Sequence, residues 1–196
     1  QVTMQDPSNP SIYAVFAETA GRRKNHTAVI YLGSRYSYGR VKELAEAFAG
    51  GLARLGVTAG SKVMLYIPNS IQWVVAWLGL QRLFFNDTAT TEIYTPHDII
   101  YIANDSGAEA IVCADTNFGY VKSALPETGL KQVVFANMAD LLPAWKRAFG
   151  YFFDVVPRGK TAADGRTRAF RSLISDAAGK TLPEAGRRCG ADTAEI

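Results

Sequence analysis

Short apolar runs alternate with longer segments of helical period from Thr27 to about Asn137, and this alternation limits the possible folds more than any other feature of the chain. A short apolar run bounded by turn residues is typical of a buried strand. Repetition of strand and helix is typical of βα units on a mainly parallel sheet. The sequence therefore predicts an α/β fold in which a mainly parallel sheet is flanked by helices.

Four apolar runs are expected to be strands, at residues 28–32, 62–67, 109–114 and 131–136. Apolar periodicity and helix start signals predict helices at about 38–55, 71–83, 96–104 and 117–125. Ser37, Thr95 and either Asn69 or Ser70 are placed to cap three of these helices. Gly56 follows the first helix and is expected to end it with a positive φ.

The character of the sequence changes after Leu142. Residues 143–157 (PAWKRAFGYFFDVVP) are rich in aromatic side chains, whereas small, polar and charged residues dominate from Arg158 onward. Loops and short helices are expected there, with a brief element at 172–174 and an exposed or disordered stretch at 177–193. We expect an α/β subdomain at 1–142, followed at 143–196 by an aromatic-rich connector and an irregular tail.

Composition and charge exclude several classes of protein. The chain is 48% hydrophobic and 20% charged, which is ordinary for a globular protein. Lysine and arginine outnumber aspartate and glutamate by only 21 to 18, too small and scattered an excess for a nucleic-acid partner. Cys113 and Cys189 are far apart and lack a C-x-x-C spacing, so neither a zinc site nor a disulfide framework is indicated.

The location expected from these features is cytoplasmic. Apolar runs fall well short of the roughly 20 residues that a membrane-spanning helix needs. The opening residues, which begin at Gln1, show no secretory signal pattern and look truncated.

Several polar and thiol side chains receive a structural interpretation. His97 lies in the first turn of an expected helix and His26 lies in a basic turn, so both are expected to be solvated rather than catalytic. Asn69 and Ser70 could face a ligand beyond the end of a strand, but helix capping explains them more simply. Cys113 is interpreted as a buried thiol within a strand.

Three sequence blocks resemble the adenylate-forming synthetases, in particular the bacterial long-chain fatty-acyl-CoA synthetases. They are YSY at 36–38 with the amphipathic helix after it, PNS at 68–70 with its apolar helix, and YTP at 94–96 with NDSGA at 104–108. Each block alone is a strand, turn and helix that many α/β proteins share, so their order and spacing carry the resemblance. It covers about residues 27–136.

The resemblance implies the N-terminal portion of an enzyme with a two-step reaction. A fatty carboxylate attacks the α-phosphorus of ATP to give an acyl-adenylate and pyrophosphate, and the thiol of coenzyme A then displaces AMP. Magnesium assists the first step. ATP, Mg²⁺ and coenzyme A are therefore expected cofactors of the full-length parent, and a fatty acid is its expected small-molecule partner.

The chain itself lacks the phosphate-binding part of that machinery. The chemistry needs a loop rich in serine, threonine and glycine, whose N–H groups surround the polyphosphate beside a lysine. No such loop occurs, and residues 190–196 resemble the stretch that precedes it in the family. We expect no catalytic, cofactor-binding or metal-binding residue in this chain, no bound cofactor and no activity of the chain alone.

A stand-alone α/β binding or membrane-interaction module without catalysis is the alternative, because many proteins share the βα rhythm. Residues 143–157 bear on this choice, since aromatic side chains there accompany Lys146 and Arg147. We favour packing of this segment against the rest of the enzyme. A peripheral contact with the membrane interface is the second interpretation.

Residues 84–95 do not fit the family pattern, which has a small apolar strand here in the sheet interior. Asn86 to Thr95 (NDTATTEIYT) are identical to one reading frame of a common sequencing-library adapter, AATGATACGGCGACCACCGAGATCTACAC. We interpret the segment as adapter read-through, an interpretation that recovery of the same codons on resequencing the source DNA would contradict. Burying Asp87 or Glu92 unpaired would cost several kcal/mol, against a typical domain stability of about 5–15 kcal/mol. The threonines and Ile93 nevertheless favour a strand.

Overall fold

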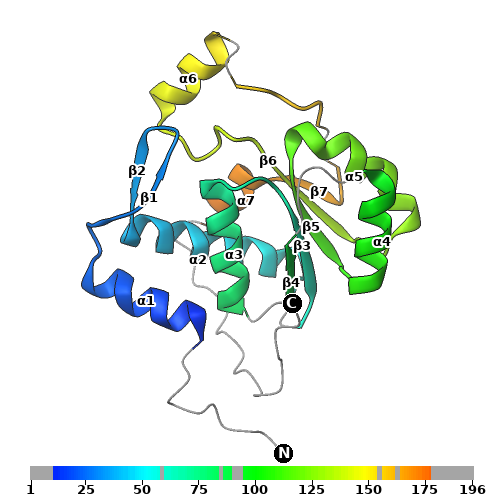
Figure 1. Ribbon diagram of the computed structural model, residues 1–196, viewed down its shortest axis with the longest axis horizontal. Helices are drawn as coiled ribbons and strands as arrows, with labels where there is room; N and C mark the ends of the chain where they lie inside the picture. Colours follow the sequence, from blue (N-terminus) through cyan, green and yellow to red (C-terminus); the bar gives the residue numbers. More distant parts are fainter. Residues whose placement is uncertain are drawn as a thin grey trace, which may run out of the picture.

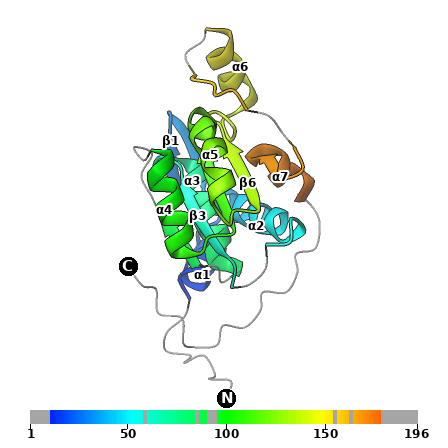
Figure 2. The ribbon, with the colours of Figure 1, turned by 90° about the vertical axis from the view of Figure 1, so that its right-hand side faces the viewer.

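A five-stranded parallel sheet lies between two layers of helices (Figures 1 and 2). The computed structural model describes residues 11–57, 60–83, 86–89, 95–153, 156–161 and 164–177. The strands, in their order across the sheet, are β4 (Asn86–Ala89), β3 (Lys62–Tyr66), β5 (Ala110–Ala114), β6 (Gln132–Ala136) and β7 (Thr167–Ala169). This arrangement confirms the α/β prediction.

The helices cover the two faces of the sheet unequally. One face carries α2 (Tyr38–Arg54), α3 (Ile71–Leu83) and α7 (Phe170–Ala177), and the other carries α4 (Pro96–Ser106) and α5 (Phe118–Ala124). Two 3₁₀ turns, Asp115–Asn117 and Leu125–Glu127, flank α5. Alternate residues of β5 enter opposite cores, because side chains of a strand point in turn to its two faces. Burial on both faces explains why the strand sequences are continuously apolar.

The helix caps predicted from the sequence are present in the structure. The Ser37 hydroxyl accepts a hydrogen bond from the Arg40 N–H at 3.2 Å, and the Ser70 hydroxyl accepts one from the Trp73 N–H at 3.1 Å. Thr95 and Asp98 form a reciprocal capping box at the start of α4. Gly56 follows α2 with a φ of +80°, as predicted. Helix α4 ends at Ser106, two residues beyond its expected end.

The prediction that residues 28–32 belong to the parallel sheet is wrong. Residues 28–31 lie in β1 (Thr27–Tyr31), which pairs with β2 (Ser34–Ser37) in a separate antiparallel hairpin, and Leu32 lies in the turn between them. Leu32 and Gly33 have φ values of +47° and +66°. Two consecutive residues of positive φ turn the chain back on itself in the manner of a tight hairpin, so β1 finds its partner immediately.

Two further elements were not indicated by the sequence. Helix α1 (Ile12–Arg22) begins at the capping residue Ser11 and contacts α2 and α3. Strand β7 pairs with β6, and Phe170 at the start of α7 is fully buried and stacks on Phe48 with ring centroids 4.9 Å apart. Part of the expected irregular tail at 143–196 therefore belongs to the same sheet and core.

The structure describes only part of residues 143–196, the predicted connector and tail. Helix α6 (Ala144–Phe152) is one of the short helices expected after Leu142. Ala177, expected to be exposed, is buried at the end of α7. Residues 178–196 lie outside the described part of the chain, as does Cys189. The division at residue 142 stays a prediction.

The adapter-like segment is described only in part. The backbone of β4 pairs in parallel with residues 62–65 of β3, and it lies at one edge of the described sheet rather than in its interior. Its origin as adapter read-through stays a hypothesis. No helix among the described residues is long and apolar enough to cross a bilayer.

Candidate functional site

A cavity of about 120 Å³ lies beyond the carboxyl ends of β3, β5 and β6, and we call it the strand-end cavity. The chain passes from β3 outward to β4 and then crosses back to β5, so strand order reverses beside this position. Open α/β sheets bind ligands at such reversal points. The residues that first follow each strand supply much of the lining, including Ile67 and Pro68 after β3, Asp115 after β5 and Asn137 after β6.

Asn137 is the centre of the hydrogen bonding at this edge of the sheet. Its Nδ2 donates to Asp115 Oδ2 at 2.8 Å and to the Pro157 carbonyl at 2.9 Å. Its Oδ1 accepts from the Ala139 N–H at 2.9 Å and from the Tyr151 hydroxyl at 3.2 Å. The side-chain amide therefore makes all four hydrogen bonds that its chemistry allows. It joins β6 to β5 and to the segment that follows α6.

Asp115 is held by neutral donors. Besides the Asn137 amide, its carboxylate accepts from the Gly159 N–H at 3.1 Å and from the Thr116 N–H at 2.9 Å. The residue is 8% exposed, and it makes no ion pair within the described residues. A carboxylate engaged in this way positions the backbone around it and is poorly placed to act as a base.

Gln72 carries the one unsatisfied group among these side chains at the strand-end cavity. Its Nε2 donates to the carbonyl oxygens of Asn137 and Met138 at 2.9 and 3.1 Å, and the residue is fully buried. Its Oε1 has no hydrogen-bond partner among the residues that the structure describes. A buried acceptor without a donor costs about 1–3 kcal/mol, so this oxygen is an energetic cost to the fold.

Sequence reasoning did not single out Gln72, Asp115 or Asn137. A usable signal was present, because Asp115 and Asn137 each follow directly after a predicted buried strand, and Gln72 follows the PNS turn. Carboxyl ends of neighbouring parallel strands lie at one edge of a sheet, so polar residues there meet.

The residues that were singled out lie where a structural role places them. His26, His97 and Asn69 are exposed, and Ser70 both caps α3 and lines the strand-end cavity. Cys113 is fully buried in β5, and burial raises the pKa of its thiol. The structure brings none of them together into a cluster.

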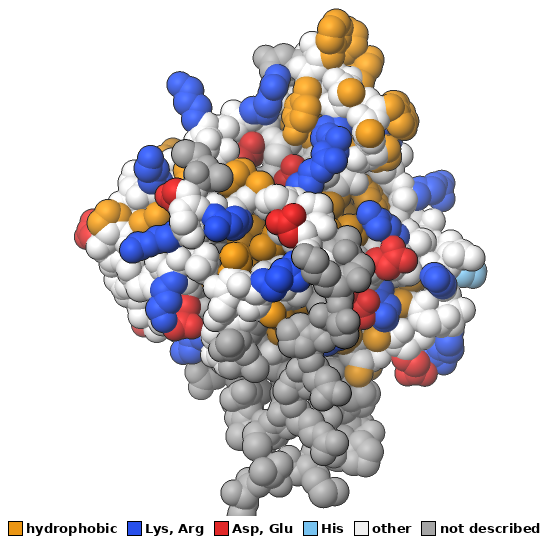
Figure 3. Space-filling view, turned by 180° about the vertical axis from the view of Figure 1, so that it is seen from behind, with side chains coloured by type: hydrophobic (Ala, Val, Ile, Leu, Met, Phe, Trp, Pro, Cys, Tyr) orange, Lys and Arg blue, Asp and Glu red, His pale blue; other side chains and the backbone are white. Residues whose placement is uncertain are grey.

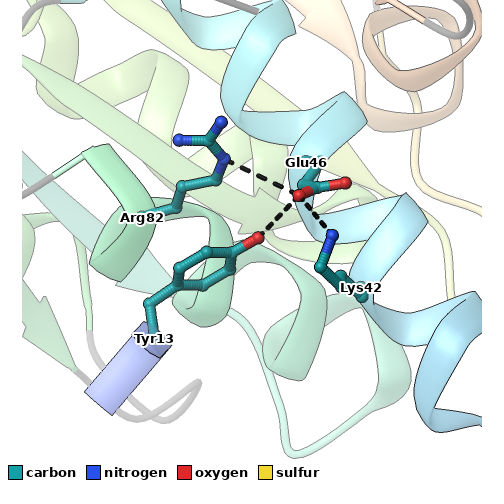
Figure 4. A network of polar contacts seen from close by, with 4 residues as sticks. All are labelled: Tyr13, Lys42, Glu46 and Arg82. Atoms are coloured by element: carbon teal, nitrogen blue, oxygen red, sulfur yellow. Dashed lines mark hydrogen bonds and ion pairs between the residues drawn. The ribbon is translucent and has the colours of Figure 1, made fainter. Parts of the chain in front are cut away.

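A second polar cluster joins three helices and is formed by Tyr13, Lys42, Glu46 and Arg82 (Figure 4). Glu46 Oε1 accepts from the Tyr13 hydroxyl at 2.9 Å and from Lys42 Nζ at 2.7 Å, and Arg82 Nε lies 3.9 Å away. Burial, together with the hydrogen bond and the negative charge of Glu46, raises the pKa of Tyr13. The cluster fastens α1 to α2 and α3, and its carboxylate is already matched by cations.

Replacing Tyr13 with phenylalanine tests this fastening role. The ring would remain while its hydrogen bond to Glu46 is lost, and we expect the free energy of unfolding to fall by about 0.5–1.5 kcal/mol. Tyr120→Phe is the control, because Tyr120 on α5 is 52% exposed. Chemical denaturation of both variants measures the difference, and equal effects would argue against the cluster.

The strand-end cavity does not fit a metal ion or a polyphosphate. Within the described residues, no group of three or more His, Cys, Asp or Glu side chains could hold a metal. The lining of the strand-end cavity contains no lysine or arginine, and it includes the Asp115 carboxylate. An anionic phosphate chain would be repelled there, whereas an uncharged, largely apolar group is suited to the cavity.

Comparison with known proteins decides the family. The AMP-binding enzyme family matches residues 16–149, which is most of the chain. The chain belongs to this family. The earlier resemblance, drawn from three sequence blocks, is thereby confirmed.

Relatives of this chain include several CoA ligases. A long-chain-fatty-acid–CoA ligase of Escherichia coli O6:H1 is 30% identical over 138 residues, which are 69% of this chain and 24% of that protein. The 4-coumarate–CoA ligase 5 of Oryza sativa subsp. japonica is 36% identical over 99 residues, or 50% of this chain and 18% of the relative. The chain thus spans about a quarter or less of the length of these relatives.

Solved structures of CoA ligases share the fold. A long-chain-fatty-acid-CoA ligase from Archaeoglobus fulgidus superposes with a TM-score of 0.70 at 19% identity, covering 92% of this chain and 32% of the other. A benzoate CoA ligase from Burkholderia xenovorans LB400 gives 0.69 at 21% identity, with 91% and 31% covered. These likenesses support the same α/β architecture over nearly the whole chain.

Proposed function

We propose that this chain is the N-terminal portion of an ATP-dependent synthetase that converts a long-chain fatty acid to its CoA thioester through an acyl-adenylate. The observation that carries the proposal is the 30% identity with long-chain-fatty-acid–CoA ligases over 138 residues. The 4-coumarate–CoA ligase match is shorter, at 99 residues, so we favour a fatty acid over an aromatic acid. We also propose a cytoplasmic location for the parent enzyme.

In this proposal the chain supplies scaffold and part of the wall of the acyl site. The strand-end cavity is the part of the described structure best suited to the second role. Its lining is mainly apolar, it carries no cation, and the buried Gln72 Oε1 accepts no hydrogen bond from the described residues. ATP, Mg²⁺ and coenzyme A would be bound by other parts of the parent, which supply the adenylation and thioester chemistry.

ATP–pyrophosphate exchange tests the proposal. We expect no exchange by the 196-residue chain, because its sequence lacks the serine-, threonine- and glycine-rich loop whose N–H groups would surround a triphosphate. The longer gene product is expected to exchange in the presence of a long-chain fatty acid, and 4-coumarate is the matched acid control. ATP–pyrophosphate exchange or tight ATP binding by the 196-residue chain would contradict the proposal that other parts of the parent bind ATP. A longer product active only with 4-coumarate would contradict the substrate class.

The DNA downstream of codon 196 separates this proposal from a stand-alone α/β module. An open frame that continues into a threonine- and glycine-rich loop is expected. A genuine stop codon directly after Ile196 would favour a binding module without catalysis.

A further inference from the structure

A groove of about 650 Å³ lies between α2 and α7, beside the first turn of α6. We call it the arginine groove, because each of these three helices contributes an arginine to its lining. Figure 3 shows the face that carries α2 and α7, where Lys and Arg side chains lie around patches of apolar surface. The arginine groove and the strand-end cavity share no lining residue, so they are separate sites.

Two of the three acidic residues in the arginine groove are already paired with cations. Glu43 Oε2 lies 3.3 Å from Arg40 Nη1, and Glu46 Oε1 lies 2.7 Å from Lys42 Nζ. The charged residues that line the groove are Arg40, Glu43, Glu46, Asp140, Arg147 and Arg171. The three that remain after pairing are two arginines and one aspartate, so the groove has an excess of positive charge.

The guanidinium groups of Arg147 and Arg171 have unused donors. Neither group makes a hydrogen bond or an ion pair with the residues that the structure describes. Burial raises the pKa of the nearby Asp140, although both guanidinium charges act to lower it. The Asp140 carboxylate accepts a hydrogen bond from the Asn137 N–H at 2.9 Å instead. The donors of both arginines are therefore available to a ligand in the groove.

The rest of the arginine groove is suited to a small molecule with an apolar part. Leu44, Leu141, Leu142 and Ile174 line it beside the arginines, and its volume lies within the range of about 300–1,000 Å³ that is typical of small-molecule sites. A guanidinium donates two parallel hydrogen bonds to a phosphate or a carboxylate. A phosphate monoester offers three terminal oxygens, so two guanidiniums can share one phosphate.

We propose that the arginine groove binds a small molecule that carries a phosphate monoester on an apolar body. Arg147 and Arg171 hold the phosphate, and the leucine side chains contact the apolar body. A nucleoside triphosphate is a poorer ligand, because its larger negative charge would be repelled by the Asp140 carboxylate. The site does not rest on the proposed function, since no step of the synthetase reaction involves it.

Isothermal titration of the 196-residue chain with phenyl phosphate tests the site. At constant ionic strength, phenyl phosphate is expected to bind more tightly than inorganic phosphate, which lacks the apolar body, and more tightly than phenol, which lacks the charge. Arg147→Gln/Arg171→Gln is expected to bind phenyl phosphate at least about tenfold more weakly, because the charge-assisted donors are lost.

Arg35→Gln/Arg54→Gln is the matched control, because it removes the same charge at two exposed arginines outside the arginine groove. This variant is expected to bind phenyl phosphate like the native chain. Circular dichroism of each variant confirms folding before titration. Arg171→Gln alone, at an exposed position, repeats the test if the double variant does not fold.

Failure to bind phenyl phosphate in the native chain would overturn the proposal. Unchanged binding by Arg147→Gln/Arg171→Gln, or an equal loss in the control, would show that these arginines do not form the site. Inorganic phosphate that binds as tightly as phenyl phosphate would exclude the apolar body, and phenol that binds as tightly would exclude the phosphate. Either result would also overturn the proposal.

Discussion

Replacing Asn137 with aspartate is expected to lower the free energy of unfolding by about 3–5 kcal/mol at neutral pH, because the change places a further carboxylate against that of Asp115 in a buried site. The Asn137 Nδ2 now donates to Asp115 Oδ2 at 2.8 Å and to the Pro157 carbonyl at 2.9 Å. In the variant, a carboxylate oxygen would face both acceptors. Two hydrogen bonds would become repulsive contacts.

The loss of stability in the Asn137→Asp variant is expected to depend on pH. Two carboxylates in contact cannot both ionise cheaply, so one of them is expected to have a raised pKa in the folded variant. A pKa raised by folding means that the folded state binds more protons than the unfolded state. Stability is therefore lost as pH rises from the ordinary carboxyl value of about 4 through the raised value, and part of it returns on acidification.

Urea denaturation of Asn137→Asp at pH 7 and pH 5 measures this effect. Asn137→Ala is the matched control, because it removes the same hydrogen bonds without adding a charge. The aspartate variant is expected to gain stability relative to the alanine variant at the lower pH. Parallel behaviour of the two variants would contradict the contact between Asp115 and Asn137.

Replacing Gly159 with alanine is expected to destabilise the fold by about 1–3 kcal/mol through overpacking. A Cβ at this position would overlap the Asp115 carbonyl oxygen and would lie 2.7 Å from the Thr116 nitrogen. These are backbone atoms and cannot rotate away. The chain also cannot retreat freely, because the Gly159 N–H donates to the Asp115 carboxylate at 3.1 Å.

Gly129→Ala is the control for this substitution, since nothing lies within 4 Å of a Cβ at that position. Its effect is expected to stay within about 0.5 kcal/mol, as for most surface changes. Thermal and chemical denaturation of both variants provide the comparison. Equal stabilities would show that residues 156–161 do not pack on the end of β5 as described.

Features that depend on near neighbours in the chain were predictable. Ser37 and Thr95 cap helices, and Gly56 takes a positive φ, because each needs only the residues beside it. The buried strands β3, β5 and β6 were predictable for a similar reason. A strand covered by helices on both faces is continuously apolar, and that property is visible in the run of residues itself.

Features that depend on residues far apart in the chain could not be predicted from the sequence. The apolar run at 28–32 looks like the other strands, but its partner is β2 because Leu32 and Gly33 turn the chain back. Strand β7 has three residues, too few for a periodic signal, and is defined by pairing with β6. The strand-end cavity likewise forms only when the sheet brings Asp115 and Asn137 together.

The amino-acid sequence by itself determined the α/β class, the family blocks and the helix ends, because short-range sterics, capping and apolar periodicity are encoded within a few residues. Only the tertiary structure decided that Asn137 meets Asp115 across 22 positions, that Gly159 closes on the same carboxylate across 44, and that Trp145, Phe149 and Phe152 of α6 are exposed. Parallel pairing aligns the carboxyl ends of strands that are remote in the chain, so these contacts exist only in the assembled sheet.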